Sequence, residues 1–480
     1  MVCLPRSNWL PAALLLAASA TPAAEPTGPF KPDWDSIRAN YVYPEWFRDA
    51  KFGIFLHWGL YSVPAHGSEW YVLHMYNDAP TIQWHTDHFG APDKFGYKDF
   101  IPLFKAENFH PDQWAELFRK AGAKYVMPTA EHHDGFAMWD SALTKWNAKN
   151  MGPHRDLVGD LAAAVRKQGL KFGVSNHRME HYSFIKPVPG LKTDLDDPSW
   201  AEFYSVANRS PEAYQKFLAD WVARNKELID KYQPDTLYFD NGVNSRDLDP
   251  QKLEVAAYYY NRAREWNKQV TILTKDAAYL AGTVKDYERE QRGPVTMQAD
   301  PWEVDDSVGY RWGYLTDDYN RNSYWHVGDI VWRLVENVSR NGNLLLNFGP
   351  RADGTFDDKQ IALMEGIGKW LDVNGEAIYK TRPWVKFGEG AAINNKPAYT
   401  GSDIRFTTNG NTLYAILMAW PGEKAVITSL AQAKITEVEM LGHKGVLKFA
   451  QSAQGLTVTM PAEQPCRYAF ALKISGLNLK

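Results

Sequence analysis

Cysteine is almost absent from this 480-residue chain. The two cysteines are Cys3 and Cys466, and Cys3 lies in an N-terminal segment that we expect to be removed. The single cysteine that remains cannot form an intramolecular disulfide, and it cannot build a cysteine-based metal site. We therefore expect neither a disulfide framework nor a metal held by thiolates.

The chain also lacks a surplus of charge of either sign. Lys and Arg total 53 and Asp and Glu total 57, which gives a net charge of −4. A basic surplus would favour nucleic acid or an anionic membrane as partner, and none is present. Beyond the N-terminal segment no stretch reaches 18 apolar residues, so no membrane span is expected.

Residues 1–24 are typical of a targeting segment. Arg6 precedes an apolar run, Leu10 to Ala20, which is too short to cross a bilayer, and small residues near position 20 offer cleavage sites. Cys3 lies ahead of the apolar run, so it is not placed as a lipoprotein anchor. We expect an exported protein, either periplasmic or extracellular.

A strand, a polar strand end and a helix recur at least five times before residue 350. This alternation predicts a parallel sheet with helical crossovers. Polar ends collected on one face favour a closed barrel, and no Gly-x-Gly-x-x-Gly follows the first strand, which disfavours a dinucleotide-binding sheet. Strands are expected near 51–59, 123–128, 171–175, 236–239, 269–274 and 343–348, and helices at 111–121, 157–167, from 211, from 249 and at 361–374.

The pattern changes beyond about Trp384. Asn409-Gly410 separates two strand-like runs and predicts a hairpin, and later runs alternate without a helical pattern. We therefore predict an α/β protein: a (β/α)8-like TIM barrel over 25–384, followed by a C-terminal antiparallel β-sandwich over 385–480. Within the barrel, 76–108 and 281–314 are expected to be irregular.

Polar residues gather where the expected strands end. The stretch 129–141 carries Glu131, His132, His133 and Asp134 in a row. Ligand sites of α/β barrels lie at the carboxyl ends of strands, which favours a functional site here. A histidine-rich loop that makes only local hydrogen bonds is the alternative. Other candidates at the same face are His57, Glu69, His177, Asp240, Glu288 and Glu303.

Paired carboxylates in such a place suggest glycosidic bond cleavage. One carboxyl group protonates the leaving oxygen, and the other attacks the sugar or activates water. Asp240 suits the second role because a rigid strand end holds it still; a helix cap or a buried salt bridge is the alternative. Histidine N–H groups could then fix the sugar hydroxyls.

A metal site is the competing interpretation of His132 and His133. Neighbouring residues on an extended strand point to opposite faces, so the two rings are not expected to share an ion. No His-x-His or His-Glu-x-x-His motif is present. We therefore expect no metal and no cofactor.

Several longer motifs are more specific. They are Asp-Ala-Lys-Phe-Gly-Ile-Phe-Leu-His-Trp-Gly at 49–59, Tyr-Ser-Val-Pro at 61–64, Ser-Glu-Trp-Tyr at 68–71, Ala-Gly-Ala-Lys-Tyr at 121–125, His-His-Asp-Gly-Phe at 132–136 and Arg-Asp-Leu at 155–157. These motifs resemble those of the glycoside hydrolase family 29 α-L-fucosidases. The resemblance implies a catalytic barrel with a β-sandwich behind it, and retaining hydrolysis of terminal α-L-fucose from fucosylated glycans through a covalent fucosyl-enzyme.

The resemblance also implies roles for individual residues. Asp240 would be the nucleophile and Glu288 the acid/base, with Glu303 as the alternative. Trp312 would line the pocket floor near the fucose methyl group. The remaining substrate-binding residues would be His57, Glu69, Trp70, His132, His133, His177 and Tyr238.

Two positions depart from the family pattern. Lys275 stands where many members carry an arginine, and 175–178 (Ser-Asn-His-Arg) differs from the aromatic-rich version common in the family. Three alternatives stay open: a related hexose as substrate, an inactive carbohydrate-binding homologue, and a metallohydrolase. The sequence makes no prediction of linkage preference or oligomeric state.

Overall fold

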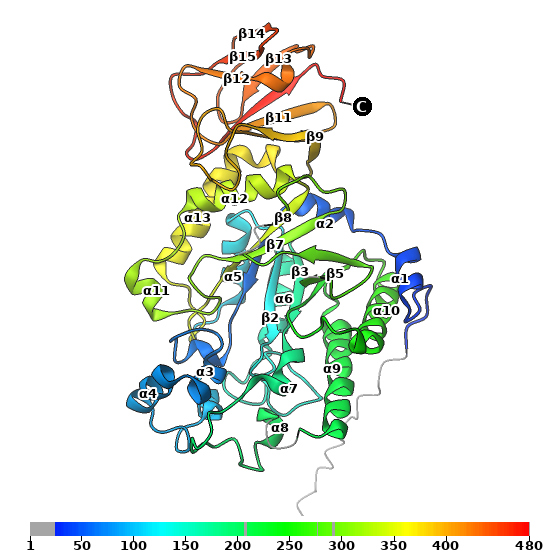
Figure 1. The fold of residues 1–480 in the computed structure, drawn as a ribbon, viewed down its shortest axis with the longest axis vertical. Coiled ribbons are helices and arrows are strands. Elements are labelled where there is room, and N and C mark those ends of the chain that lie inside the picture. Colours follow the sequence, from blue (N-terminus) through cyan, green and yellow to red (C-terminus); the bar gives the residue numbers. More distant parts are fainter. Residues whose placement is uncertain (1–24, 206–208, 276, 290–292, 480) are drawn as a thin grey trace, which may run out of the picture.

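Eight parallel strands close into a barrel, in chain order, and the first strand pairs with the last (Figure 1). The computed structural model describes residues 25–205, 209–275, 277–289 and 293–479. Residues 1–24 lie outside it, so the targeting segment and export stay predictions. The barrel strands are β1 (Phe52–Leu56), β2 (Tyr125–Glu131), β3 (Lys171–Asn176), β4 (Thr236–Phe239), β5 (Thr271–Lys275), β6 (Thr283–Asp286), β7 (Trp302–Ser307) and β8 (Gly342–Phe348). The predicted TIM-like barrel is confirmed.

The outer helices begin and end at residues that the sequence marks. Ser210 caps α9 by accepting a hydrogen bond from Ala213 N, and Gly375 follows the last residue of α13. The helices that cover the barrel are α5 (Pro111–Lys120), α6 (Leu157–Lys167), α9 (Pro211–Tyr232), α10 (Asp249–Glu265), α12 (Val327–Ser339) and α13 (Asp358–Asn374). At the N-terminal side, α1 (Trp34–Asn40) packs on α10, and Phe47 of α2 (Glu45–Ala50) joins the apolar cluster inside the barrel.

Two stretches predicted to be irregular contain regular elements. Residues 76–108 hold the end of α3 (Tyr71–Asn77), then α4 (Ala79–His88) and a 3-10 helix, η2 (Tyr97–Leu103). Asp78 caps α4 through Thr81 N, a short-range signal that the periodicity argument missed. Residues 281–314 hold β6 and β7. The prediction of an irregular stretch was therefore wrong here, because β7 carries acidic side chains into the barrel interior.

The outer layer is thin beside β6. No helix follows β5 or β6 within the described residues of 276–301, whereas α12 follows β7. Short helical segments at the carboxyl side are α7 (His181–Phe184), α8 (Ala201–Tyr204) and α11 (Thr316–Arg321). The flank of the barrel between β6 and α12 is therefore covered by loops.

A β-sandwich follows the barrel, as predicted, and it sits on α12 and α13 (Figure 1). In β11, Tyr414 and Ile416 pack with the barrel-side core, while Leu413 and Leu417 pack inside the sandwich. The period of two thus lets one strand serve both cores. The five-stranded sheet holds β13 (Glu437–Met440), β16 (Phe470–Ser475), β11 (Thr412–Leu417), β10 (Ile404–Asn409) and β9 (Arg382–Glu389), and the other holds β12 (Lys424–Ile427), β15 (Gly455–Thr459) and β14 (Phe449–Ser452).

A buried ionic network joins the two parts. Glu336 of α12 is 1% exposed, and its carboxylate accepts from Arg340 at 2.8 Å, from Arg405 at 2.7 Å and from the Tyr399 hydroxyl at 2.6 Å. Arg405 belongs to the sandwich and Arg340 follows α12 in the barrel. Across the described part of the chain, no helix is both long and apolar enough to cross a membrane.

Candidate active site

A cavity of about 250 Å³ lies at the carboxyl ends of the barrel strands. The side chains that line it lie directly after β1, β2, β3 and β4, within β5 and β7, in and just before α3, and in the loops that follow β6 and β7. The lining residues are His57, Ser68, Glu69, Trp70, His74, His132, His133, His177, Asp240, Asn241, Lys275, Glu288, Asp305, Arg311 and Trp312. The predicted catalytic and substrate-binding residues are present in this wall, except Tyr238 and the alternative acid/base Glu303.

Asp240 lies at the base of the cavity, directly after β4. Its Oδ1 forms an ion pair with Lys275 Nζ at 2.5 Å, and its Oδ2 lies 2.9 Å from His177 Nδ1 and 3.5 Å from His133 Nε2. Burial alone would raise the pKa of Asp240, but Lys275, His177 and the hydrogen-bonding rings around it hold that pKa well below its usual value. The carboxylate is therefore kept ionised.

Glu288 faces Asp240 across Lys275. Lys275 Nζ lies 3.0 Å from Glu288 Oε2 and 2.5 Å from Asp240 Oδ1, so the two carboxylate oxygens are at most 5.5 Å apart. Backbone hydrogen bonds on either side, from Tyr287 N to Glu303 O and from Arg289 N to Asp305 O, fix the segment against β7. The Glu288 side chain is 35% exposed and that of Asp240 is 7% exposed, so Glu288 is the more accessible carboxyl group.

His57 is oriented by a residue of the neighbouring strand. Asn347 Oδ1 accepts from His57 N at 2.9 Å and lies 2.8 Å from His57 Nδ1, while Asn347 Nδ2 donates to Trp312 O at 2.7 Å. This arrangement assigns the proton to Nδ1 and leaves Nε2 as an acceptor. Burial, reinforced by His177, lowers the pKa of His57 well below its usual value, so the ring is neutral.

His132 and His133 both line the cavity, which corrects the alternation argument. β2 ends at Glu131, so the two residues leave the extended geometry and their ring centroids lie 4.3 Å apart. Burial and neighbouring rings lower the pKa of His132 well below its usual value. For His133, burial opposes the charge, but Asp240 and the Glu180 carboxylate outweigh it, and the pKa of His133 is raised.

His177 connects the nucleophile candidate to β3. Its Nε2 hydrogen-bonds with Ser175 Oγ at 2.6 Å, and its Nδ1 points to Asp240. Burial lowers the pKa of His177 in spite of Asp240. The neutral ring therefore holds Asp240 in place, in addition to lining the cavity.

Glu69, Trp70 and Trp312 build the outer wall. Glu69 Oε2 accepts from the backbone N–H groups of Trp312 at 3.0 Å and Gly313 at 3.3 Å. The Trp312 ring lies 5.1 Å from the His57 ring, centroid to centroid. Trp70 is 37% exposed and stands at the edge of the cavity.

Tyr238 and Glu303 do not reach the cavity. The Tyr238 hydroxyl donates into the barrel interior, to Asp305 at 3.1 Å and Asp286 at 3.2 Å, so its prediction as a substrate contact is wrong. Glu303 lies within β7, fully buried, where the Tyr125 hydroxyl donates to it. Burial raises the pKa of Glu303. Glu303 therefore lies inside the barrel and not in the cavity wall.

Some lining residues were missed by the sequence reasoning. Asp305 and Arg311 come from the stretch that was predicted to be irregular, Asn241 directly follows Asp240, and His74 lies in α3, which was assigned no role. Two signals were available: Arg311 directly precedes Trp312, and Glu303 and Asp305 alternate as residues on one face of a strand do.

Two groups in the cavity have a geometry that a metal ion could use. The ligand atoms of His57, His132 and His177 lie within 4.8 Å of one another, as do those of His133, His177 and Asp240. In the second group, the Lys275 ammonium already contacts the Asp240 carboxylate, and a divalent cation there would be repelled. The first group consists of rings that could equally accept from or donate to sugar hydroxyls.

Comparisons with known proteins agree along the whole chain. The family models "Alpha-L-fucosidase" and "Alpha-L-fucosidase C-terminal domain" match residues 16–376 and 398–475. The tissue α-L-fucosidases of Rattus norvegicus and Homo sapiens are 34% and 32% identical, covering 97% and 98% of this chain and 96% and 97% of theirs. The crystal structure of Thermotoga maritima α-fucosidase in complex with fucose has a TM-score of 0.74 and 33% identity, and the match covers 93% of this chain and all of that one.

Proposed function

The chain belongs to the α-L-fucosidase family, and we propose that it removes terminal α-L-fucose from glycans with retention of configuration, through a covalent fucosyl-enzyme. The observation that carries the retaining mechanism is the position of the two carboxyl groups. The oxygens of Asp240 and Glu288 that contact Lys275 are at most 5.5 Å apart. Retaining glycosidases have carboxyl groups about 5–5.5 Å apart, whereas inverting enzymes need roughly 6.5–9.5 Å to admit water.

The reaction follows from the two environments. Asp240 is buried, ionised and held by Lys275 and His177, so it attacks the anomeric carbon while Glu288 gives its proton to the departing glycosidic oxygen. The bond from C1 to that oxygen breaks, and the bond from C1 to Asp240 forms. In the second step Glu288 takes a proton from water, the water oxygen bonds to C1, and Asp240 leaves as a carboxylate.

Neutral histidine rings account for recognition of the sugar. His57 presents Nε2 as an acceptor, because its Nδ1 proton is used by Asn347. Among the described residues, none hydrogen-bonds the buried Nδ1 of His132, so this atom is available to a sugar hydroxyl. Trp312 lies against the His57 ring and offers an apolar surface for the fucose methyl group.

Azide rescue of two variants tests the mechanism. With an aryl α-L-fucoside, we expect Asp240→Gly to be inactive and to regain turnover with azide, giving the β-fucosyl azide, because azide attacks from the face that Asp240 occupied. We expect Glu288→Ala to give the α-fucosyl azide, because azide attacks the covalent intermediate from the opposite face. Glu303→Ala, if it folds, is the control and should give no azide adduct.

The outcomes separate the alternatives. If Asp240→Gly keeps most of its rate, another strand-end carboxylate is the nucleophile. If both variants give the same azide anomer, the two-step mechanism is wrong. If folded wild-type protein fails on the fucoside but cleaves another hexoside, the sugar assignment falls while the fold assignment stands.

A further inference from the structure

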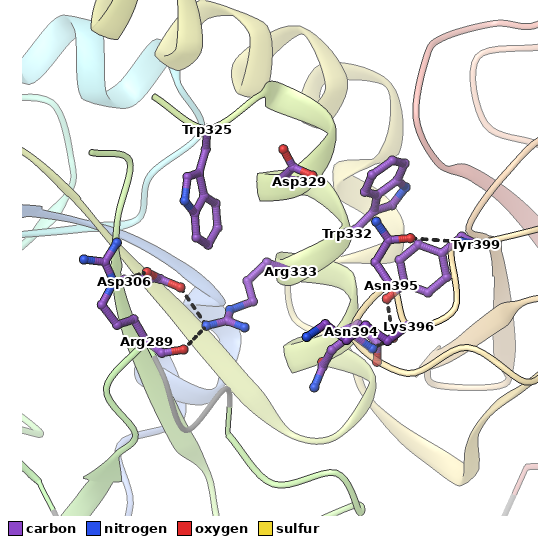
Figure 2. Close-up of a pocket in the computed structure, with 11 residues that line it drawn as sticks. Arg289, Asp306, Trp325, Asp329, Trp332, Arg333, Asn394, Asn395, Lys396 and Tyr399 are labelled. Carbon is purple, nitrogen blue, oxygen red and sulfur yellow. Dashed lines mark hydrogen bonds and ion pairs between the residues drawn. The ribbon is translucent and has the colours of Figure 1, made fainter. Parts of the chain in front are cut away.

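A second, larger cavity lies where the barrel meets the sandwich. Its volume is about 690 Å³, and it occupies the flank of the barrel where no described helix follows β6. α12 forms its floor, and a sandwich loop, 394–399, closes one side (Figure 2). It is lined by Arg289, Asp306, Trp325, Asp329, Trp332, Arg333, Glu336, Asn394, Asn395, Lys396 and Tyr399, none of which lines the catalytic cavity.

Two of the three aromatic rings in this cavity, those of Trp332 and Tyr399, are held in position by hydrogen bonds. Figure 2 shows Trp325 on one side, Trp332 and Tyr399 on the other, and Arg333 between them. The Trp332 indole donates to Met418 O at 3.0 Å, and the Tyr399 hydroxyl donates to Glu336 at 2.6 Å. Neither ring needs to be ordered when a ligand arrives, which lowers the entropic cost of binding.

The charges in the cavity wall are balanced. The lining contains three basic residues and three acidic ones, namely Arg289, Arg333 and Lys396, and Asp306, Asp329 and Glu336. Asp306 forms ion pairs with Arg289 at 3.2 Å and with Arg333 at 2.6 Å, so both guanidinium groups are already paired. A phosphate or sulfate would have to compete with this carboxylate. The electrostatics therefore favour an uncharged ligand with many hydroxyl groups.

We propose that this junction cavity binds a neutral oligosaccharide, at a site separate from the catalytic one. Aromatic faces pack on the C–H faces of sugar rings, and the paired amide and charged groups around them can donate to and accept from hydroxyls. The volume is within the range of about 300–1,000 Å³ typical of ligand pockets. It is more than twice that of the catalytic cavity, so it has room for more than one sugar unit.

The junction cavity and the catalytic cavity share backbone but no side chain. Arg289 follows Glu288 in the chain, and Asp306 follows Asp305, so neighbouring residues face opposite cavities. A glycan held at the junction therefore lies beside the segment that carries Glu288. This arrangement would keep a polymeric or surface-bound glycan near the enzyme without filling the catalytic cavity.

Binding of a fucose-free glycan to the full-length protein tests the proposal. The probe is lacto-N-tetraose, a neutral tetrasaccharide, measured by isothermal titration and saturation-transfer NMR with the catalytic cavity saturated by L-fucose. Cellotetraose and xylotetraose extend the panel, and a sialylated tetraose is the charged comparison. We expect at least one neutral glycan to bind despite the fucose, and the charged one to bind more weakly.

Variants locate the site. Trp325→Ala is expected to weaken glycan binding about tenfold or more and to leave hydrolysis of a small aryl fucoside unchanged. Asn395→Ala should also weaken binding and serves as a second variant if Trp325→Ala is unstable. Trp266→Ala is the matched control, because Trp266 is another half-buried tryptophan of the barrel but lines neither cavity.

Three results would overturn the proposal. They are no binding of any neutral glycan at millimolar concentration, binding that L-fucose displaces, and binding that Trp325→Ala and Asn395→Ala both leave unchanged. Each is independent of the proposed catalytic function, because an active fucosidase with no junction site gives normal aryl fucoside kinetics and a flat titration.

Discussion

Lys275 is the residue whose replacement tests the proposed chemistry most directly. Its ammonium group is the shared partner of Asp240 at 2.5 Å and Glu288 at 3.0 Å. Burial would lower the pKa of Lys275, but Asp240, Asp305 and Glu288 raise it well above its usual value, so the group stays charged. Replacing it with glutamine leaves two carboxyl groups within 5.5 Å of each other and no cation between them.

The size of the effect follows from Coulomb's law. Two unit charges 4 Å apart interact by about 4 kcal/mol at an effective dielectric constant of about 20, and the distances here are shorter. Desolvation of the buried ammonium offsets part of this interaction. A net loss of about 2–4 kcal/mol corresponds to a decrease of roughly 30- to 1,000-fold in kcat/KM on the acid side of the profile.

The direction in which the pH profile of kcat/KM moves follows from the ionisation of Asp240. Asp240 must be ionised to attack, and Lys275 is the largest of the influences that lower its pKa. Without the ammonium group the pKa of Asp240 rises, so the acid limb of kcat/KM moves to higher pH. Activity should recover in part as the pH is raised and Asp240 ionises. Lys275→Arg keeps the charge and should keep the limb near its wild-type position.

The assay is hydrolysis of an aryl α-L-fucoside over about pH 4–9 by wild type, Lys275→Gln and Lys275→Arg. Lys285→Gln is the matched control, because Lys285 is an exposed lysine of β6 that lines no part of the cavity. A loss in Lys275→Gln that is equal at every pH would refute the electrostatic argument and point to a geometric role. An activity within about twofold of wild type would show that the ammonium group contributes little.

Three further outcomes are expected. Asn347→Ala releases the His57 ring, and kcat/KM for an aryl fucoside should fall about 100-fold; a loss below twofold would contradict this orienting role. Glu336→Ala removes the carboxylate partner of buried arginines at the domain junction and should lower the free energy of unfolding, measured by chemical denaturation, by about 3–5 kcal/mol. Replacement of the exposed Glu365 by alanine is the control and should cause no measurable change. Burial lowers the pKa of His181 from 6.5 to about 3, so the folded ring stays neutral while the unfolded one takes up a proton, and stability should fall by about 1.4 kcal/mol per pH unit below pH 6.5. His181→Asn should flatten that decline in thermal unfolding, and an unchanged slope would refute the assignment.

The elements that sequence predicted well are those with local signals. The helix over 157–167 and the cap at Ser210 follow from periodicity and from one side chain accepting a nearby N–H. The predictions for the stretches 76–108 and 281–314 failed because the local signals there are weak. β7 points Glu303 and Asp305 into the barrel interior, and its apolar residues are only Trp302 and Val304, which is too short an alternation to single out a strand.

The residues of the candidate site also divide into those that a local pattern predicted and those that it did not. His57 and Asp240 were found because each follows an apolar strand, and barrels place strand ends together. The error over Tyr238 came from a side chain that points into the barrel interior rather than out of its mouth. Asp305 was missed because its strand was missed.

The sequence by itself determined the family, the order of strands and helices, and the set of polar residues at the strand ends. These depend on neighbours in the chain and on long motifs. Only the tertiary structure decided that one ammonium group bridges Asp240 and Glu288, that Glu303 is enclosed inside the barrel, and that a cavity opens against the sandwich. Distances between residues far apart in sequence are set by how the barrel closes, and no local pattern encodes them.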